Sequence, residues 1–80
     1  MFAVTLLSCH EVLFEGQAQH VVLPGEQGVF EVWPFHRSLI SRLLPGVIVV
    51  DERLFPIRRG VVKVTRGAVS ALIEPEQASE

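Results

Sequence analysis

The sequence is poor in cysteine and in basic charge, two features on which several classes of small protein depend. It is 80 residues long, with one cysteine and seven Lys plus Arg against nine Asp plus Glu. One cysteine cannot close a disulfide within the chain, which excludes the disulfide frameworks of small secreted domains and fits a reducing compartment. A net charge of −2 provides no field to hold the chain on phosphate backbones, so nucleic acid is not an expected partner.

Long apolar runs are missing as well. Crossing a bilayer takes roughly 18 to 20 apolar residues, and the densest stretch, residues 39–50, is interrupted by a charge and by Pro45-Gly46. No direct membrane insertion is therefore expected. The chain is nevertheless 49% apolar and only 20% charged, which predicts one folded domain with a packed core. After Glu74 the composition changes, and residues 76–80 are predicted to form a frayed tail.

Short runs of Val, Ile, Leu and Phe predict an all-β protein. Turn-forming pairs separate them at spacings of about 8 to 12 residues, which is typical of a sandwich or a barrel. The predicted turns include Glu15-Gly16, Arg59-Gly60 and Arg66-Gly67, the last closing a two-residue hairpin with a positive φ at the glycine. The predicted strands span residues 2–7, 12–14, 17–23, 29–32, 47–50, 61–66 and 69–74. Residues 38–44 are expected to be a strand or a single turn.

Two of these strands alternate between apolar and polar side chains. The side chains predicted to face inward are Val62, Val64, Val69, Ala71 and Ile73, and those predicted to face water are Lys63, Thr65, Ser70 and Glu74.

The residues that could carry chemistry form no catalytic pattern. Cys9 and His10 are adjacent, and neighbours on a strand point to opposite faces, so we expect a small buried thiol beside a surface histidine. His10, His20 and His36 lack the spacing of metal ligands. No catalytic residue, metal or cofactor is therefore predicted.

The charged pairs have structural interpretations. Glu11 and Glu15 are predicted to be solvated charges at the two ends of a short strand, and Arg58-Arg59 to be turn charges before Gly60. An anion-gripping role for the two arginines is the alternative. No glycine-rich phosphate loop is present.

One segment concentrates three of the six aromatic residues, including the only tryptophan. It reads Val29-Phe30-Glu31-Val32-Trp33-Pro34-Phe35. Because Glu31 shares a face with Val29 and Trp33, that face is predicted to point outward. Exposed aromatic side chains beside a proline turn indicate a protein-binding edge, with core packing as the alternative.

Five short motifs occur in a characteristic order. They are Val12-Leu13-Phe14-Glu15-Gly16, Val21-Val22-Leu23-Pro24-Gly25-Glu26-Gln27-Gly28, Trp33-Pro34-Phe35-His36-Arg37-Ser38-Leu39, Leu44-Pro45-Gly46-Val47 and Gly60-Val61-Val62-Lys63-Val64. Together they resemble the amino-terminal β-sandwich domain of the epsilon subunit of F-type ATP synthases. The resemblance is collinear from about Phe2 to Glu74, which makes residues 1–75 an epsilon-like domain.

The resemblance implies a two-sheet β-sandwich of about ten short strands. It also implies a non-catalytic central-stalk (rotor) subunit of a proton- or sodium-translocating synthase, which joins the gamma shaft to the membrane ring. Such a subunit is peripheral, on the cytoplasmic side of the bacterial inner membrane. The partner-binding residues implied are Glu26, Val29, Glu31, Trp33, Pro34, Phe35, His36, Arg37 and Ser38.

The sequence departs from the family pattern in three places. Phe35 replaces a glycine, Arg37-Ser38 replaces Ala-Pro, and Arg58-Arg59 replaces small residues. The 80 residues also do not include the family's carboxy-terminal helical hairpin, so neither inhibition nor nucleotide binding is expected here. The alternatives are a free-standing protein-interaction module outside the synthase and a small enzyme that uses Cys9 or His36.

Overall fold

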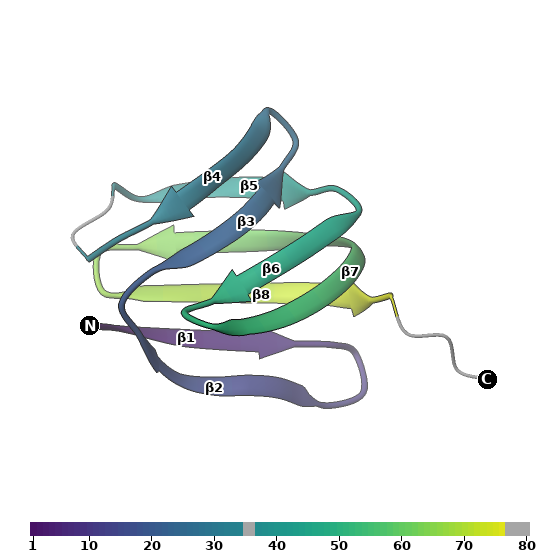
Figure 1. Ribbon diagram of the computed structural model, residues 1–80, viewed down its shortest axis with the longest axis horizontal. Coiled ribbons are helices and arrows are strands. Elements are labelled where there is room, and N and C mark those ends of the chain that lie inside the picture. Colours follow the sequence, from purple (N-terminus) through teal and green to yellow (C-terminus); the bar gives the residue numbers. More distant parts are fainter. Residues whose placement is uncertain (35–36, 77–80) are drawn as a thin grey trace.

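The structure, a computed structural model, describes residues 1–34 and 37–76. These residues form eight strands and no helix, so none of the described segments is a helix that could cross a membrane. The strands are β1 (Phe2–Leu7), β2 (Val12–Ala18), β3 (Val21–Gly25), β4 (Gly28–Val32), β5 (Leu39–Leu43), β6 (Gly46–Val50), β7 (Arg53–Thr65) and β8 (Ala68–Pro75). The all-β prediction is confirmed (Figure 1).

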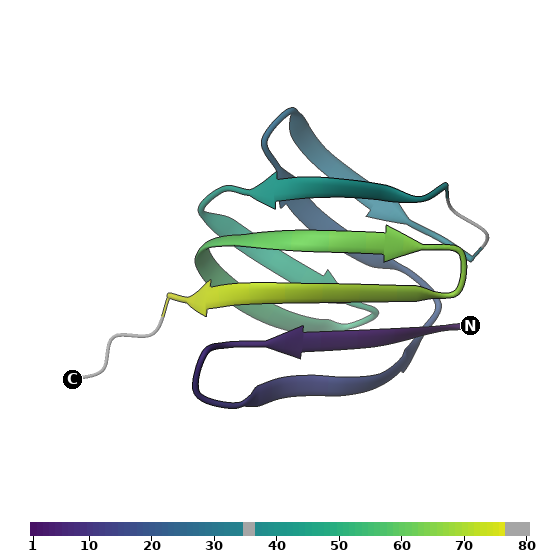
Figure 2. The same ribbon diagram turned by 180° about the vertical axis from the view of Figure 1, so that it is seen from behind.

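The strands make two layers because β7 belongs to both. Its first half, Arg53–Ile57, pairs with β6, whereas its second half pairs with β5 and β8. One layer, here the β8 layer, contains β2, β1, β8, the second half of β7 and β5; the other, the β3 layer, contains β4, β3, β6 and the first half of β7. Figures 1 and 2 show the two layers from opposite sides. The described residues thus contain eight strands rather than about ten, with one 13-residue strand serving both layers.

The core lies between these layers and is entirely apolar among the described residues. Its buried side chains are Phe2, Val4, Leu6, Ala18, Val21, Leu23, Val32, Leu43, Ile48, Val50, Ile57, Val62, Val64, Val69, Ala71 and Ile73. The alternation predicted for β7 and β8 is confirmed on both faces. Burying one Val, Leu or Ile side chain stabilises the fold by about 1.5 to 3 kcal/mol, so this layer of side chains is the main source of stability.

The first two turns differ from those predicted. β2 continues through Glu15-Gly16 to Ala18, and the β1–β2 connection lies at residues 8–11, where the Ser8 hydroxyl accepts hydrogen bonds from the His10 and Glu11 backbone N–H groups. Residues 17–23 are likewise not one strand. The chain turns between β2 and β3, where the Asp51 carboxylate accepts hydrogen bonds from the Gln19 and His20 N–H groups at 3.1 and 3.2 Å. A distant side chain therefore fixes a turn that local sequence did not show.

The predicted turn at Arg59-Gly60 is also wrong, because both residues lie inside β7. A Cβ atom on Gly60 would lie 2.8 Å from the backbone oxygen of Leu72 and 2.8 Å from Cγ2 of Ile73. Glycine is there because β8 approaches closely, not because the chain reverses. Arg59 pairs with Glu74 at 2.8 Å, so it is a strand charge with a neighbour on β8.

Two further turn predictions have mixed outcomes. The hairpin at Arg66-Gly67 is confirmed, but the positive-φ residues are Gly28, at 123°, and Asp51, at 52°, rather than Gly67. Residues 38–44 contain the strand β5, one of the two expected forms. For the predicted tail, residues 77–80 lie outside the described part of the chain.

Candidate protein-interaction surface

The β3–β4 hairpin presents the aromatic segment as predicted. β4 is an edge strand. Only β3 pairs with it among the described residues, so its other edge is unpaired there. Val29 is 72% exposed and Trp33 52% exposed, whereas Val32 is buried and Phe30 packs partly against the core. The outward face of this strand is therefore the one that contains Glu31.

Trp33 is held in place by two neighbours. Its indole N–H donates a hydrogen bond to Oε1 of Glu31 at 3.0 Å, and its ring stacks on the imidazole of His20 with centroids 4.8 Å apart and planes 16° apart. His20 Nδ1 lies 3.8 Å from Oδ1 of Asp51, the same carboxylate that fixes the β2–β3 turn. An exposed tryptophan is thus pre-positioned by a turn from another part of the sequence.

The sequence did not point to His20 or Asp51 as part of this surface. They lie in the β2–β3 and β6–β7 connections, and only the fold brings them beside Trp33. No local motif marks either residue. The two residues come together because β3 pairs with both β4 and β6, and sequence spacing does not show this pairing.

The predicted partner-binding residues are spread along the hairpin. Glu26 is exposed in the β3–β4 turn, at the end of β4 opposite Trp33, where its N–H donates to the Arg42 carbonyl at 3.1 Å. Pro34 is half-buried, and Arg37 and Ser38 are exposed. The two remaining predicted residues, Phe35 and His36, lie outside the described residues. The structure therefore gathers Glu31 and Trp33 with His20, and places Glu26 apart from them.

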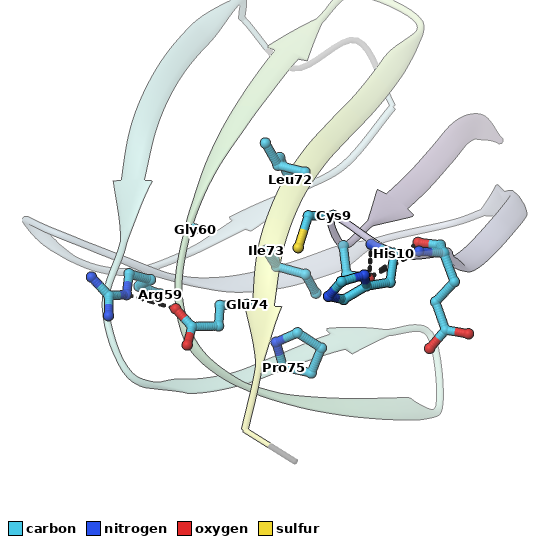
Figure 3. A pocket seen from close by; sticks show the side chains of 10 residues that line it. Cys9, His10, Arg59, Gly60, Leu72, Ile73, Glu74 and Pro75 are labelled. Carbon is cyan, nitrogen blue, oxygen red and sulfur yellow. Dashed lines mark hydrogen bonds and ion pairs between the residues drawn. The ribbon is translucent and has the colours of Figure 1, made fainter. Parts of the chain in front are cut away.

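A second feature is an open pocket of about 580 Å³ beyond the end of β1 (Figure 3). Its apolar lining comes from β8, notably Leu72 and Pro75, and its rim carries Cys9, His10 and the Arg59–Glu74 ion pair. Cys9 is exposed, so the prediction of a buried thiol is wrong: the residue lies in the β1–β2 connection instead of on a strand.

These features offer contact surface rather than a reaction centre. The described residues contain no group of three or more His, Cys, Asp or Glu side chains that could hold a metal ion. None of the polar or charged side chains among the described residues is buried. What the arrangement can do chemically is bind another surface through apolar, aromatic and charged groups.

The family model of the ATP synthase delta/epsilon chain β-sandwich domain matches residues 1–75. The chain belongs to this family. Curated relatives include the ATP synthase epsilon chain of Bordetella avium, 37% identical over 75 residues, which cover 86% of this chain and 52% of the relative. The epsilon chain of Bordetella parapertussis is 36% identical over 77 residues, which cover 89% and 54%. The chain thus spans about half the length of the curated relatives it matches.

Solved structures show the same fold. A chain in the structure of the Euglena gracilis mitochondrial ATP synthase, solved as OSCP, F1 and c-ring, superposes with a TM-score of 0.82 at 19% identity over 90% of this chain and 49% of the other. A chain in the central stalk and c-ring structure of the Tetrahymena thermophila mitochondrial ATP synthase gives a TM-score of 0.74 at 13% identity over 91% and 63%. At these identities the likeness is one of fold.

Proposed function

We propose that this epsilon-family domain is part of a non-catalytic central-stalk (rotor) subunit of an F-type ATP synthase, joining the gamma shaft to the membrane ring. The observation that carries the proposal is the family match over residues 1–75. The named epsilon-chain relatives, at 36–37% identity, support it. The structure of the Tetrahymena central stalk and c-ring contains a chain of the same fold.

The geometry suits a subunit whose task is rigid adhesion. Two hydrogen-bonded layers enclose an all-apolar core, and β7 ties the layers together covalently. A load applied to one layer is therefore carried directly into the other through a single strand. Such a body can hold two partners at a fixed distance without chemistry of its own.

The partner surface that we propose is centred on Glu31 and Trp33. An exposed aromatic ring is the type of residue that dominates interface energetics. Ordering a free side chain at an interface costs about 0.5 to 1.5 kcal/mol, and the His20 stack and the Glu31 hydrogen bond reduce that cost for Trp33 before any partner arrives. The remaining members of the proposed surface are Glu26, Val29, Pro34, Phe35, His36, Arg37 and Ser38.

The proposed place of the subunit is peripheral, on the cytoplasmic side of a bacterial inner membrane, through the synthase complex. Neither nucleotide binding nor inhibition is proposed for this domain, because the resemblance assigns both to a helical hairpin that the 80 residues do not include.

A binding experiment with defined components tests the proposal. The purified chain is added to F1 complex stripped of its epsilon subunit, taken from the source organism, and the bound fraction is measured by gel filtration. We expect stoichiometric rebinding through gamma. Trp33→Ala serves as the surface variant and Val12→Ala, a change at a 55% exposed valine on β2 in the β8 layer, as the control. Failure of the unmodified chain to bind would favour a free-standing interaction module.

A further inference from the structure

The backbone hydrogen bonds of the β3–β4 hairpin follow from its loop. β3 is the only paired neighbour of β4 in the part of the chain that the structure describes, and β4 lies at the border of its layer (Figure 1). A two-residue loop joins the two strands, so Gly25 and Gly28 form the hydrogen-bonded pair that closes the hairpin. In an antiparallel ladder every second pair is hydrogen-bonded, so Leu23 and Phe30 form the next bonded pair.

The pairs in between direct their backbone groups away from each other. They are Pro24 with Val29 and Val22 with Glu31. Proline has no N–H to donate, and the Pro24 carbonyl accepts the Leu44 N–H at 2.8 Å on the β5 side of β3, which agrees with this alternation. The N–H and C=O groups of Val29 and Glu31 therefore point outward from the edge of the sheet, where a further strand can bond to them.

β4 lacks the features that usually protect such an edge. Natural sheets protect their edges with bulges, prolines or charged side chains, lysine above all. β2, at the other end of the sheet path, has a register shift that leaves Leu13 without a partner on β1. The β3–β4 register has no shift, and β4 contains neither proline nor lysine; its one charged side chain is Glu31. The edge of β4 is thus an open template for an added strand.

We propose that β4 holds its partner by strand addition: an extended segment of the partner pairs with the free edge through the backbone groups of Val29 and Glu31. The side chains of β4 define the chemistry of that segment. Opposite Glu31, on the outer face, we expect Lys or Arg, because opposite charges on cross-strand neighbours are favourable. Opposite Phe30 the partner's side chain points inward and should be apolar. This inference rests on the proposed function, since it describes how the β3–β4 hairpin binds a synthase subunit.

A pocket beside β4 fits the inward side chain of such a segment. Its volume is about 420 Å³, and it lies between the β3–β4 turn and β5, with Phe30 and Leu39 in its lining. Both side chains are half-buried and pack against the core at its border. A strand on the β4 edge would place one apolar side chain over them and so extend the core. The unpaired backbone groups and the pocket therefore favour the same occupant.

Hydrogen exchange on the unmodified chain tests the pairing. Deuterium uptake is measured by mass spectrometry at single-residue resolution, for the free chain and for the chain bound to F1 complex stripped of its epsilon subunit. In the free chain the Val29 and Glu31 amides should exchange fast and the Phe30 amide slowly, since only Phe30 donates to β3. Binding should slow Val29 and Glu31 at least about tenfold. Unchanged uptake at these two amides in the bound chain would overturn strand addition and leave the proposed function intact.

A matched pair of variants separates the backbone of Glu31 from its side chain. Glu31→Pro and Glu31→Ala both remove the carboxylate, but only proline also removes the N–H at the free edge. Proline is tolerated where the N–H faces solvent, so both variants should fold, which circular dichroism checks. We expect Glu31→Pro to bind the stripped F1 complex about tenfold more weakly than Glu31→Ala. Equal affinities would overturn the proposal, and if the proline variant does not fold, hydrogen exchange decides alone. If the unmodified chain does not rebind, the proposed function fails and this inference fails with it.

Discussion

The indole of Trp33 lies on the imidazole of His20, with ring centroids 4.8 Å apart and planes inclined by 16°. His20 lies in the β2–β3 connection and Trp33 directly follows β4, and the stack leaves Trp33 52% exposed. This contact turns an exposed tryptophan, which could otherwise adopt several rotamers, into a fixed feature of the surface. It also gives a direct optical probe, because Trp33 is the only tryptophan in the chain.

His20→Ala should free the indole. We expect a change in Trp33 emission and more efficient quenching by acrylamide, because one face of the ring loses its cover. An aromatic pair contributes about 0.5 to 1.5 kcal/mol, so the free energy of unfolding should fall by no more than that. His10→Ala is the control: it removes an exposed histidine from the β1–β2 connection and should leave the emission unchanged. Equal spectra for both variants would contradict the stack.

Glu31→Ala and Trp33→Ala should separate binding from folding. Glu31 is exposed, so Glu31→Ala should change thermal stability little. Trp33→Ala also removes the stack on His20, which contributes about 0.5 to 1.5 kcal/mol to folding. Binding to a gamma-like shaft subunit should weaken by about 2 kcal/mol for Trp33→Ala. Phe35→Ala is predicted to behave in the same way. Leu23 on β3 is fully buried, so Leu23→Ala should instead cost about 2 to 5 kcal/mol of folding free energy. Calorimetry and binding isotherms on the same samples distinguish the two classes.

Gly60→Ala should destabilise the sandwich. The new Cβ would lie 2.8 Å from the Leu72 carbonyl oxygen, and backbone cannot move aside as a flexible side chain can. Overpacking of this kind typically costs about 1 to 3 kcal/mol. At Gly67, by contrast, nothing lies within 4 Å, so Gly67→Ala should be nearly neutral. Urea midpoints that shift equally for the two alanine variants would show that β7 and β8 are not packed as described.

Asp51→Ala should loosen the β2–β3 turn. The carboxylate accepts the Gln19 and His20 N–H groups, and losing a partly exposed capping interaction of this type costs about 0.5 to 2 kcal/mol. Asp51→Asn should cost less, because asparagine keeps an acceptor oxygen and tolerates the φ of 52°. Amide hydrogen exchange at His20 provides the readout. If the His20 amide exchanges as slowly in Asp51→Ala as in the unmodified chain, the turn does not depend on this side chain.

MgATP should not stabilise the 80-residue chain. A ligand that binds only the folded state adds about 2.7 kcal/mol of stability at 100 times its dissociation constant. We therefore expect no change in melting temperature with millimolar MgATP or with divalent metal ions alone. A clear rise with either would reveal a binding site that the present account does not contain.

Much of the fold could be predicted from the alternation of apolar and polar side chains, because in a strand with one buried face the apolar side chains mark that face. Val62 and Val64 are inward, and Trp33 is outward, as the pattern indicated. The prediction was wrong where glycine was interpreted as a turn residue. Gly60 serves close packing between strands, and nothing in its local sequence separates that role from chain reversal.

The candidate interaction surface was predictable only in part, because sequence patterns show local exposure but not contacts between distant segments. Glu31 and Trp33 could be identified from one short segment, since their exposure depends on strand alternation. His20 and Asp51 could not, because their roles arise from contacts between connections that are distant in the chain. The exposed Cys9 was missed because the rule that neighbours on a strand point to opposite faces was applied to a residue that lies between two strands.

The most direct test of the central proposal is the identity of the proteins that accompany this chain in its own cells. The chromosomal gene is tagged at its carboxy terminus, membranes are solubilised in mild detergent, and the captured proteins are identified by mass spectrometry with and without Trp33→Ala. The account predicts recovery of the gamma subunit and the ring subunits of an F-type ATP synthase, with reduced recovery for the variant. Capture of a different set of proteins, with no synthase subunit among them, would contradict it.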